Sequence, residues 1–410
     1  MQLSRRRAAG ARARARARGW RRVGLVVLVA LLAPLARGAS GHADDPWRLS
    51  LDGFAYSDTD NVQILAPQTA VRYALDSEGG EFGVRYMADI VSAASVDVLS
   101  HATTRFEEVR HEGAVWASKA FGDHLPSLAY RLSREPDYLS HDLRAGWQSR
   151  VGGADSTLSG GVGLTLDTIT RSGTPPEAFE ESLQTYSLEL GLTQNLSSRA
   201  LLRGVATFTL QRGYLEKPYR YVALFDAAGL DRAQAEGVAL DLDTFDRYRL
   251  ALRPPEQVPD SRARGALALR FMYSLESIGA ALRLDYQLYL DDWGVLANTL
   301  APSLRQKLGA GFRMDLGLRL YHQRAASFWR RVYVVRDVAE IPRLRSADRE
   351  LSRYLTVSAT LRLAWGSEGG SADPLEAYVE VGVMQSFFPD FLFLDQRTAL
   401  TTLLGGRARL

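Results

Sequence analysis

Apolar and polar side chains alternate with a period of two through residues 262–323. In the first segment of this stretch, Leu267, Leu269 and Phe271 share one side, and Arg270 and Met272 lie on the other. The alternation resumes after short interruptions and repeats in four successive segments, the third of which is less regular. Such a pattern predicts β-strands with one apolar face and one charged face.

The same alternation recurs along most of the chain and predicts an all-β fold. Besides the four segments in 262–323, we expect a strand that ends at residue 75 and one strand on each side of a tight turn at 195–198. The other expected strands are 47–56, 81–91, 106–120, 125–134, 139–152, 157–168, 351–365, 375–388 and 398–410. A soluble sandwich would need a second sheet to cover every apolar face. A transmembrane, antiparallel, up-and-down β-barrel of about 16 strands instead turns all apolar faces toward lipid and all charged faces toward a lumen.

Free energy decides which face points outward. An arginine at the lipid midplane costs ~2–4 kcal/mol, and a dozen would exceed the ~5–15 kcal/mol that stabilises an ordinary domain. The charged side chains are therefore expected to line the lumen. The candidates are Arg85, Asp89, Arg110, Glu112, Arg203, Arg270, Arg283, Asp285, Arg313, Asp315, Arg319 and Arg362. The pattern leaves open whether they line water or pair as salt bridges.

The connections between the predicted strands alternate between long and short. Bacterial barrels have short periplasmic turns and long extracellular loops, so the long connections are expected outside the cell. The longest are 213–261 and 325–350. For the first, two interpretations stand: a plug or lid over the pore, or an extension of the wall in which 219–225 pairs with 245–252.

The basic residues are concentrated before the barrel. Residues 1–43 hold ten arginines and no acidic residue or lysine, so the other 367 residues carry 40 of the 50 Lys and Arg against all 47 Asp and Glu. A basic start followed by an apolar run, 23–35, predicts a cleaved signal peptide of residues 1–43, with the barrel at 44–410. The basic balance therefore gives no reason to expect nucleic-acid binding. With no cysteine, neither disulfides nor thiolate metal sites can form.

Several short segments resemble one bacterial family. They are Phe106-Glu107-Glu108-Val109-Arg110-His111-Glu112-Gly113, Ser133-Arg134-Glu135-Pro136-Asp137-Tyr138-Leu139-Ser140-His141, Tyr56-Ser57-Asp58-Thr59-Asp60, 255–262 and 348–351. Together they are similar to the outer-membrane barrel family filed as domain of unknown function 3570, across nearly all of the mature chain. The resemblance implies a Gram-negative outer-membrane barrel and no particular activity.

Histidines and carboxylates gather in or beside the predicted outer loops. His101, Asp137 and His141 are the candidate metal ligands, with Glu107 and Glu108 nearby. Imidazole and carboxylate groups bind metals or act as acids and bases. The alternative is a hydrogen-bonded rim that orders the loops. No HExxH, P-loop or GxSxG motif is present, and we expect no cofactor.

Three functions fit this sequence. A barrel of about 16 strands is wide enough for an aqueous channel, and an arginine-rich lumen favours small polar or anionic solutes. We therefore expect a pore in the outer membrane of a Gram-negative bacterium, in contact with outer-membrane lipid. The alternatives are an outer-membrane enzyme or metal-binding surface protein that uses the rim residues, and a structural or partner-binding barrel. The sequence gives no catalytic residue and leaves the cargo and the oligomeric state open.

Overall fold

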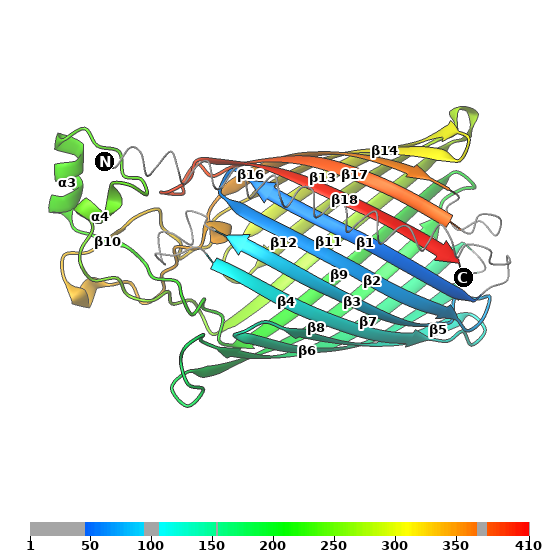
Figure 1. Cartoon of the computed structure of the whole chain (residues 1–410), viewed down its shortest axis with the longest axis horizontal. Coiled ribbons are helices and arrows are strands. Elements are labelled where there is room, and N and C mark those ends of the chain that lie inside the picture. The colour runs from blue at the N-terminus through cyan, green and yellow to red at the C-terminus, as the bar shows by residue number, and fades with distance from the viewer. Residues whose placement is uncertain (1–45, 94–105, 153–154, 367–374, 410) are drawn as a thin grey trace.

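Sixteen antiparallel strands close into a barrel in the computed structural model, which describes residues 46–93, 106–152, 155–366 and 375–409 (Figure 1). Neighbours in sequence are neighbours in the wall, and β1 pairs with β18 to close it. The strands are β1 (Trp47–Asp58), β2 (Val62–Ala74), β3 (Glu81–Ala93), β4 (Phe106–Ser118), β5 (His124–Arg134), β6 (Tyr138–Val151), β7 (Ser156–Thr170), β8 (Glu180–Asn195), β9 (Ala200–Gly213), β11 (Ser261–Leu275), β12 (Ala280–Asp291), β13 (Leu296–Gly309), β14 (Phe312–Gln323), β16 (Tyr354–Trp365), β17 (Leu375–Phe387) and β18 (Gln396–Arg409). The up-and-down barrel predicted from the alternation is confirmed.

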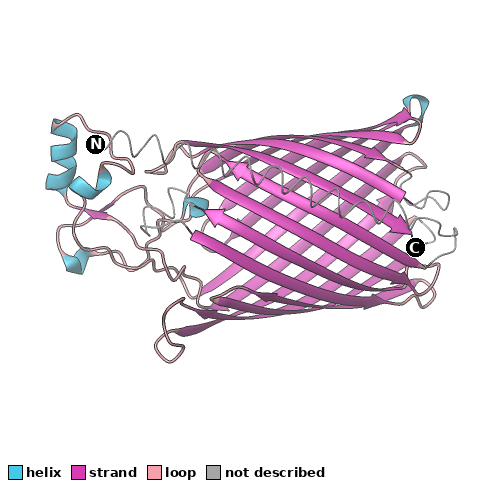
Figure 2. Ribbon diagram, viewed as in Figure 1, coloured by secondary structure: helices cyan, strands magenta, loops and turns pink. Residues whose placement is uncertain are grey.

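The two ends of the barrel differ in their connections. Tight turns join the strands at one end, for example the 3-10 turn η1 (Glu276–Ile278), which Gly279 closes in the left-handed conformation. Long loops gather at the other end, where they form a small folded layer beyond the wall (Figure 2). We call these the turn end and the cap end. β1 begins at the turn end and the last strand, β18, finishes there, as an even strand count requires.

Each strand turns its two kinds of side chain to opposite sides of the wall. Along β12, the alternate residues Leu282, Leu284 and Tyr286 are exposed on the outer face. Buried polar groups lie on the other face, as with Glu112 of β4 and Asp142 of β6, each only 4% exposed. The concave side of a curved sheet is the more crowded one, so the polar face is the lumen face. The polar phase predicted from the cost of charge in lipid is therefore the one on the inner side of the wall.

Aromatic side chains surround the outer face at the turn end. Trp47, Phe82, Trp147, Tyr273, Phe312 and Trp365 are all exposed there. Register places several of them side by side, because Trp47 pairs with Tyr73, Tyr73 with Phe82, and Phe312 with Trp365. Rings at this level suit the boundary between hydrocarbon and headgroups.

The cap is built mainly from the two longest loops. The first carries β10 (Leu224–Phe225), α3 (Ala227–Ala235) and α4 (Phe245–Tyr248), and the second carries β15 (Tyr333–Val334), η2 (Val338–Glu340) and η3 (Arg349–Leu351). β10 pairs in parallel with β15. The predicted strand pairing of 219–225 with 245–252 is therefore wrong in the main. The two segments form one isolated backbone bridge, between Phe225 and Arg249, and otherwise pack through side chains such as Phe225 and Phe245.

None of the helices in the described part of the chain is long and apolar enough to cross a membrane.

A charge placed on the outer face should destabilise the barrel more than the same charge on the lumen face. Leu284 lies halfway along β12, and we expect Leu284→Arg to lower the free energy of unfolding in lipid vesicles by about 2–4 kcal/mol. Gln287→Arg, on the lumen face of the same strand, is the matched control and should cost less than about 1 kcal/mol. Equal costs in a denaturant titration would contradict the assignment of the two faces.

Candidate functional site

The charged residues predicted for the lumen lie on the polar face of the wall. Each occupies the strand phase opposite to the exposed apolar residues; Arg85, for example, stands between Val84 and Tyr86 in β3, both exposed on the other side. The set contains Arg85, Asp89, Arg110, Glu112, Arg203, Arg270, Arg283, Asp285, Arg313, Asp315, Arg319 and Arg362. The candidate functional site is therefore the inner wall of the barrel together with the cap at its mouth.

A ladder of ion pairs crosses four neighbouring strands on one side of the lumen. Glu112 of β4 lies 2.6 Å from Arg85 of β3 and 3.3 Å from Arg131 of β5. Arg131 continues to Asp142 of β6 at 3.6 Å, and Arg144 approaches the same carboxylate at 2.9 Å. Each buried carboxylate is thus held between two guanidinium groups, the arrangement that compensates best for its loss of water.

The opposite wall repeats this arrangement. Asp285 of β12 accepts from Arg270 at 2.7 Å and lies 3.3 Å from Arg283. Arg305 of β13 pairs with Asp315 of β14 at 2.5 Å. Near the turn end, Glu376 of β17 collects Arg313 at 2.9 Å, Arg362 at 3.7 Å and Arg407 at 3.7 Å. The lumen charges are therefore mostly paired across strands.

Pairing does not withdraw these arginines from solvent. The side chains of Arg144 and Arg407 are 60% and 59% exposed, and those of Arg270, Arg283 and Arg305 are 41–43% exposed. The guanidinium groups therefore lie along the wall with one side open to the lumen. These charges therefore form salt bridges and keep part of each guanidinium side chain exposed.

Two of the twelve lumen candidates have no part in the ladders of ion pairs. Among the described residues, Arg203 of β9 and Arg319 of β14 are exposed and have no carboxylate within ion-pair distance. Arg203 is register partner to Arg270, whose charge Asp285 already neutralises. Arg319 lies over the ring of Tyr321, 5.1 Å from its centroid. Their charge is not neutralised by a close carboxylate, and two carboxylates on the same face, Glu189 of β8 and Glu380 of β17, likewise have no ion pair among the described residues.

An aromatic cluster sits in the mouth of the barrel at the cap end. Trp293, Trp329, Phe388 and Phe391 are buried together with Val258, Val295, Ala326 and Leu351. Tyr289 and Tyr354, on the lumen face of β12 and β16, pack against this cluster. The cap is therefore seated on the inner side of the wall at these strands.

A line of polar contacts ties the cap to loops around the rim. The Tyr219 hydroxyl donates to Asp137 at 2.7 Å. Arg220, which follows Tyr219, donates to Asp348 at 2.6 Å. Arg349, which follows Asp348, donates to the buried Asp60 at 2.6 Å. Three loops, β5–β6, β9–β11 and β14–β16, are thereby linked to the β1–β2 loop.

The electrostatics of this line favour its charged form. Burial alone would raise the pKa of Asp348, but Arg220 and the Glu350 amide outweigh burial and lower it. Burial raises the pKa of Tyr219 to about 12, and the hydrogen bond to Asp137 adds to the effect, so this hydroxyl keeps its proton and donates.

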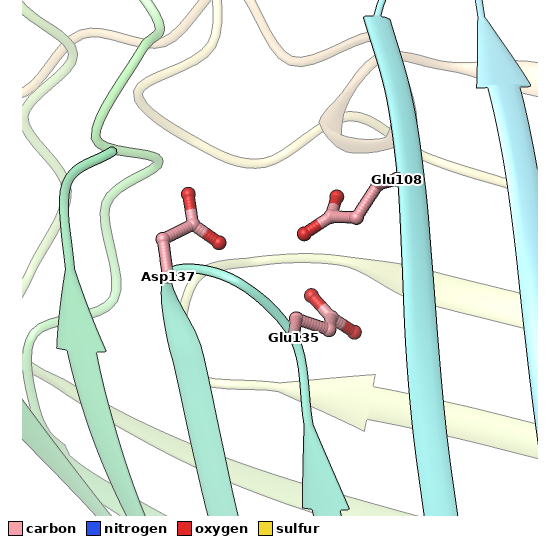
Figure 3. A group of neighbouring side chains, drawn as sticks. All are labelled: Glu108, Glu135 and Asp137. Atoms are coloured by element: carbon pink, nitrogen blue, oxygen red, sulfur yellow. The ribbon is translucent and has the colours of Figure 1, made fainter. Parts of the chain in front are cut away.

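Three carboxylates converge at the rim beside this line (Figure 3). One oxygen each from Glu108 of β4 and from Glu135 and Asp137 in the β5–β6 loop lie within 4.8 Å of one another, and all three residues are half-buried. Burial raises the pKa of Glu135, although Arg110, 3.9 Å away, works against it. Three carboxylate oxygens form part of the shell that a hard divalent cation such as Ca²⁺ takes.

The candidate metal ligands from the sequence do not all meet. Asp137 is in the cluster, but His141 is exposed in β6, where its Nδ1 lies 2.8 Å from the Tyr130 hydroxyl. His101 lies outside the described residues. Glu135 was not a candidate; its place two residues before Asp137, just past the end of the strand that pairs with the strand of Glu108, could have indicated it. A metal role for Asp137 stays a prediction.

The family comparison covers about two thirds of the chain. Residues 96–372 match the family model described as "Protein of unknown function (DUF3570)". The early segment 56–60, which also suggested the resemblance, lies outside this match. No curated protein matches the chain significantly.

Solved structures share the barrel with very little sequence. CdiB from Acinetobacter baumannii gives a TM-score of 0.50 at 9% identity, over 88% of this chain and 60% of that one. The siderophore receptor PirA from Pseudomonas aeruginosa gives 0.43 at 12% identity, over 88% and 61%. OccK11 (OpdR) from P. aeruginosa gives 0.41 at 12%, over 90% and 97%. The chain thus spans about three fifths of the first two, and the likeness is one of fold.

Removing the Asp348 carboxylate should loosen the cap and leave the wall intact. Asp348→Asn weakens the ion pair with Arg220 and should lower the free energy of opening the loop by ~1–2 kcal/mol. We therefore expect limited proteolysis within 213–261 to become about tenfold faster. Asp337→Asn is the matched control, because Asp337 also caps a 3-10 turn, at Ala339, but the described contacts give it no link to another loop. Equal cleavage of the two variants would contradict the anchoring role.

The acidic cluster predicts divalent-cation binding that depends on its loop residues. In calcium titrations of the folded barrel, we expect stoichiometric binding that Asp137→Asn weakens by about tenfold, since one charged ligand is lost. His141→Ala serves as the control and should leave the binding unchanged. The hypothesis fails if calorimetry detects no stoichiometric binding to the wild-type protein.

Proposed function

Because this chain belongs to the family described as protein of unknown function (DUF3570), whose description assigns no activity, we propose its function from its geometry: a pore for small anionic or polar solutes. The observation that carries the proposal is the solvent exposure of lumen arginines such as Arg144, Arg270 and Arg283. A barrel that served only as a membrane anchor would not need charged side chains open to an internal aqueous space. Barrels of this strand number have room for such a channel.

The charge distribution favours anions over cations. Four lumen carboxylates, Glu112, Asp142, Asp285 and Glu376, are each shared between two or more arginines, so their charge is neutralised locally. The twelve lumen candidates comprise eight arginines and four carboxylates, and Arg203 and Arg319 have no described carboxylate within ion-pair distance. In a narrow aqueous path with low-dielectric walls, a small excess of one sign raises the local concentration of the opposite ion.

The cap supports a controlled entrance. Its aromatic cluster occupies the mouth beside β11–β17, and the polar line from Asp137 to Asp60 holds the loops together. A solute that enters from the cap end must pass between these loops. This arrangement favours small solutes and stands closer to the lid interpretation of 213–261 than to a wall extension.

The outer membrane of a Gram-negative bacterium is the location that fits this barrel. Its apolar outer face and aromatic belt suit a bilayer, and the basic segment before the barrel has the composition of a signal peptide. With short turns toward the periplasm, the cap faces outward. Outer-membrane lipid is then the partner that covers the apolar band.

Planar-bilayer recordings test the pore. We expect a small unit conductance with a preference for chloride over potassium, and Arg203→Gln combined with Arg319→Gln should reduce that preference by roughly half, because the unbalanced lumen charge is lost. Arg199→Gln, in the tight turn between β8 and β9, is the control and should keep the wild-type ratio. Absence of conductance, or selectivity for potassium, would overturn the proposal.

A further inference from the structure

Two histidines and an arginine occupy neighbouring positions on the outer face of the wall near the cap end. His111 of β4 is the direct register partner of Arg134, the last residue of β5. His141 of β6 is register partner to Leu132, two residues before Arg134, and therefore lies diagonally across from it. Direct partners on one face have Cβ atoms about 4.5–5.5 Å apart, and diagonal ones lie within reach of a long side chain. All three residues are exposed.

Two tyrosines fix the histidines of this group. The Tyr86 hydroxyl lies 2.8 Å from Nδ1 of His111, and the Tyr130 hydroxyl lies 2.8 Å from Nδ1 of His141. When the tyrosine donates to Nδ1, the imidazole carries its own proton on Nε2. Each ring then presents an N–H donor in a fixed orientation. The same tyrosine–histidine contact thus occurs on two neighbouring strand pairs. Both imidazole rings are held in place, and Arg134 lies between them.

The surroundings of this group are apolar. The outer-face register partners of the three residues, apart from one another, are Ala88, Leu132, Leu139 and Leu166. Toward the turn end the same face continues with Val115, Leu128 and Leu143, all exposed. Within the described part of the chain, Arg134 has no ion-pair partner. Positive charge therefore sits where a continuous apolar surface ends.

We propose that His111, Arg134 and His141 form a binding site for the phosphate of a lipid headgroup in the leaflet at the cap end. A phosphate monoester accepts several hydrogen bonds and suits an arginine flanked by N–H donors. The acyl chains of the same lipid would lie on the apolar strip below. A soluble anion would use the basic group alone, whereas the junction of charge and apolar surface matches both halves of a lipid.

This inference rests on the proposed membrane location, which the following experiment also examines separately. The full chain is purified in a neutral detergent, exposed to phosphatidic acid or phosphatidylcholine, and analysed by native mass spectrometry. We expect wild type to retain phosphatidic acid in preference. Arg134→Gln should reduce that retention about fivefold, which is about 1 kcal/mol for one basic group at a membrane surface.

The matched control is His322→Gln. His322 lies exposed on the outer face of β14, and its register partners, Asn298 and Leu355, are uncharged. This variant should bind phosphatidic acid as wild type does. If Arg134→Gln fails to fold, His141→Gln gives the same test, with a loss of at least about twofold expected.

Three outcomes would overturn the proposal: equal retention of the two lipids by wild type, unchanged retention in the folded Arg134 and His141 variants, or displacement of phosphatidic acid by millimolar inorganic phosphate. The third outcome would identify a free-phosphate site. Conductance of the same preparations separates this question from the pore, because a conducting barrel without lipid preference refutes only the lipid site. A protein that folds in buffer without detergent would refute the membrane location itself.

Discussion

The incompatibility of charge with hydrocarbon organises this molecule. Because a strand turns alternate residues to opposite sides, each strand that faces lipid must send its polar residues inward. Away from the strand ends, the arginines of the wall are therefore confined to the polar phase, which brings them together in one enclosed space. The ion-pair ladders from Arg85 to Arg144 and from Arg270 to Asp315 are the result: carboxylates placed between guanidinium groups make that concentration of charge tolerable.

The sequence predicted the wall well because period two is a strong and local signal. The ends of most strands fall within about three residues of the expected positions, and the polar phase agrees with the buried carboxylates Glu112 and Asp142. Local alternation could not reveal which charges pair. Arg313 of β14 and Glu376 of β17 come together only because β14 pairs with β16, on the far side of a long loop, and β16 pairs with β17.

The structure of the cap could not be predicted from the alternation of apolar and polar residues. Its residues follow no period, and its contacts join loops far apart in sequence, such as β10 with β15 and Gln257 with Arg345. Segment 245–252 has strand-like composition, yet it starts as the short helix α4, because Phe245 and Tyr248 are buried against Phe225 and Ala233. The rim shows the same limit: Asp137 and the nearby Glu108 were identified, whereas Glu135 depended on the geometry of the β5–β6 loop.

The parallel pairing of β10 with β15 has a consequence for the order of assembly. Leu224 and Phe225 belong to the middle of the chain, whereas Tyr333 and Val334 follow the next four wall strands. Residues of the last loop, Phe388 and Phe391, complete the buried aromatic cluster. The cap can therefore reach its final packing only once the loop between β17 and β18 is present. Until then the aromatic side chains of the cluster lack Phe388 and Phe391 as packing partners, so closure of the mouth belongs to the end of folding.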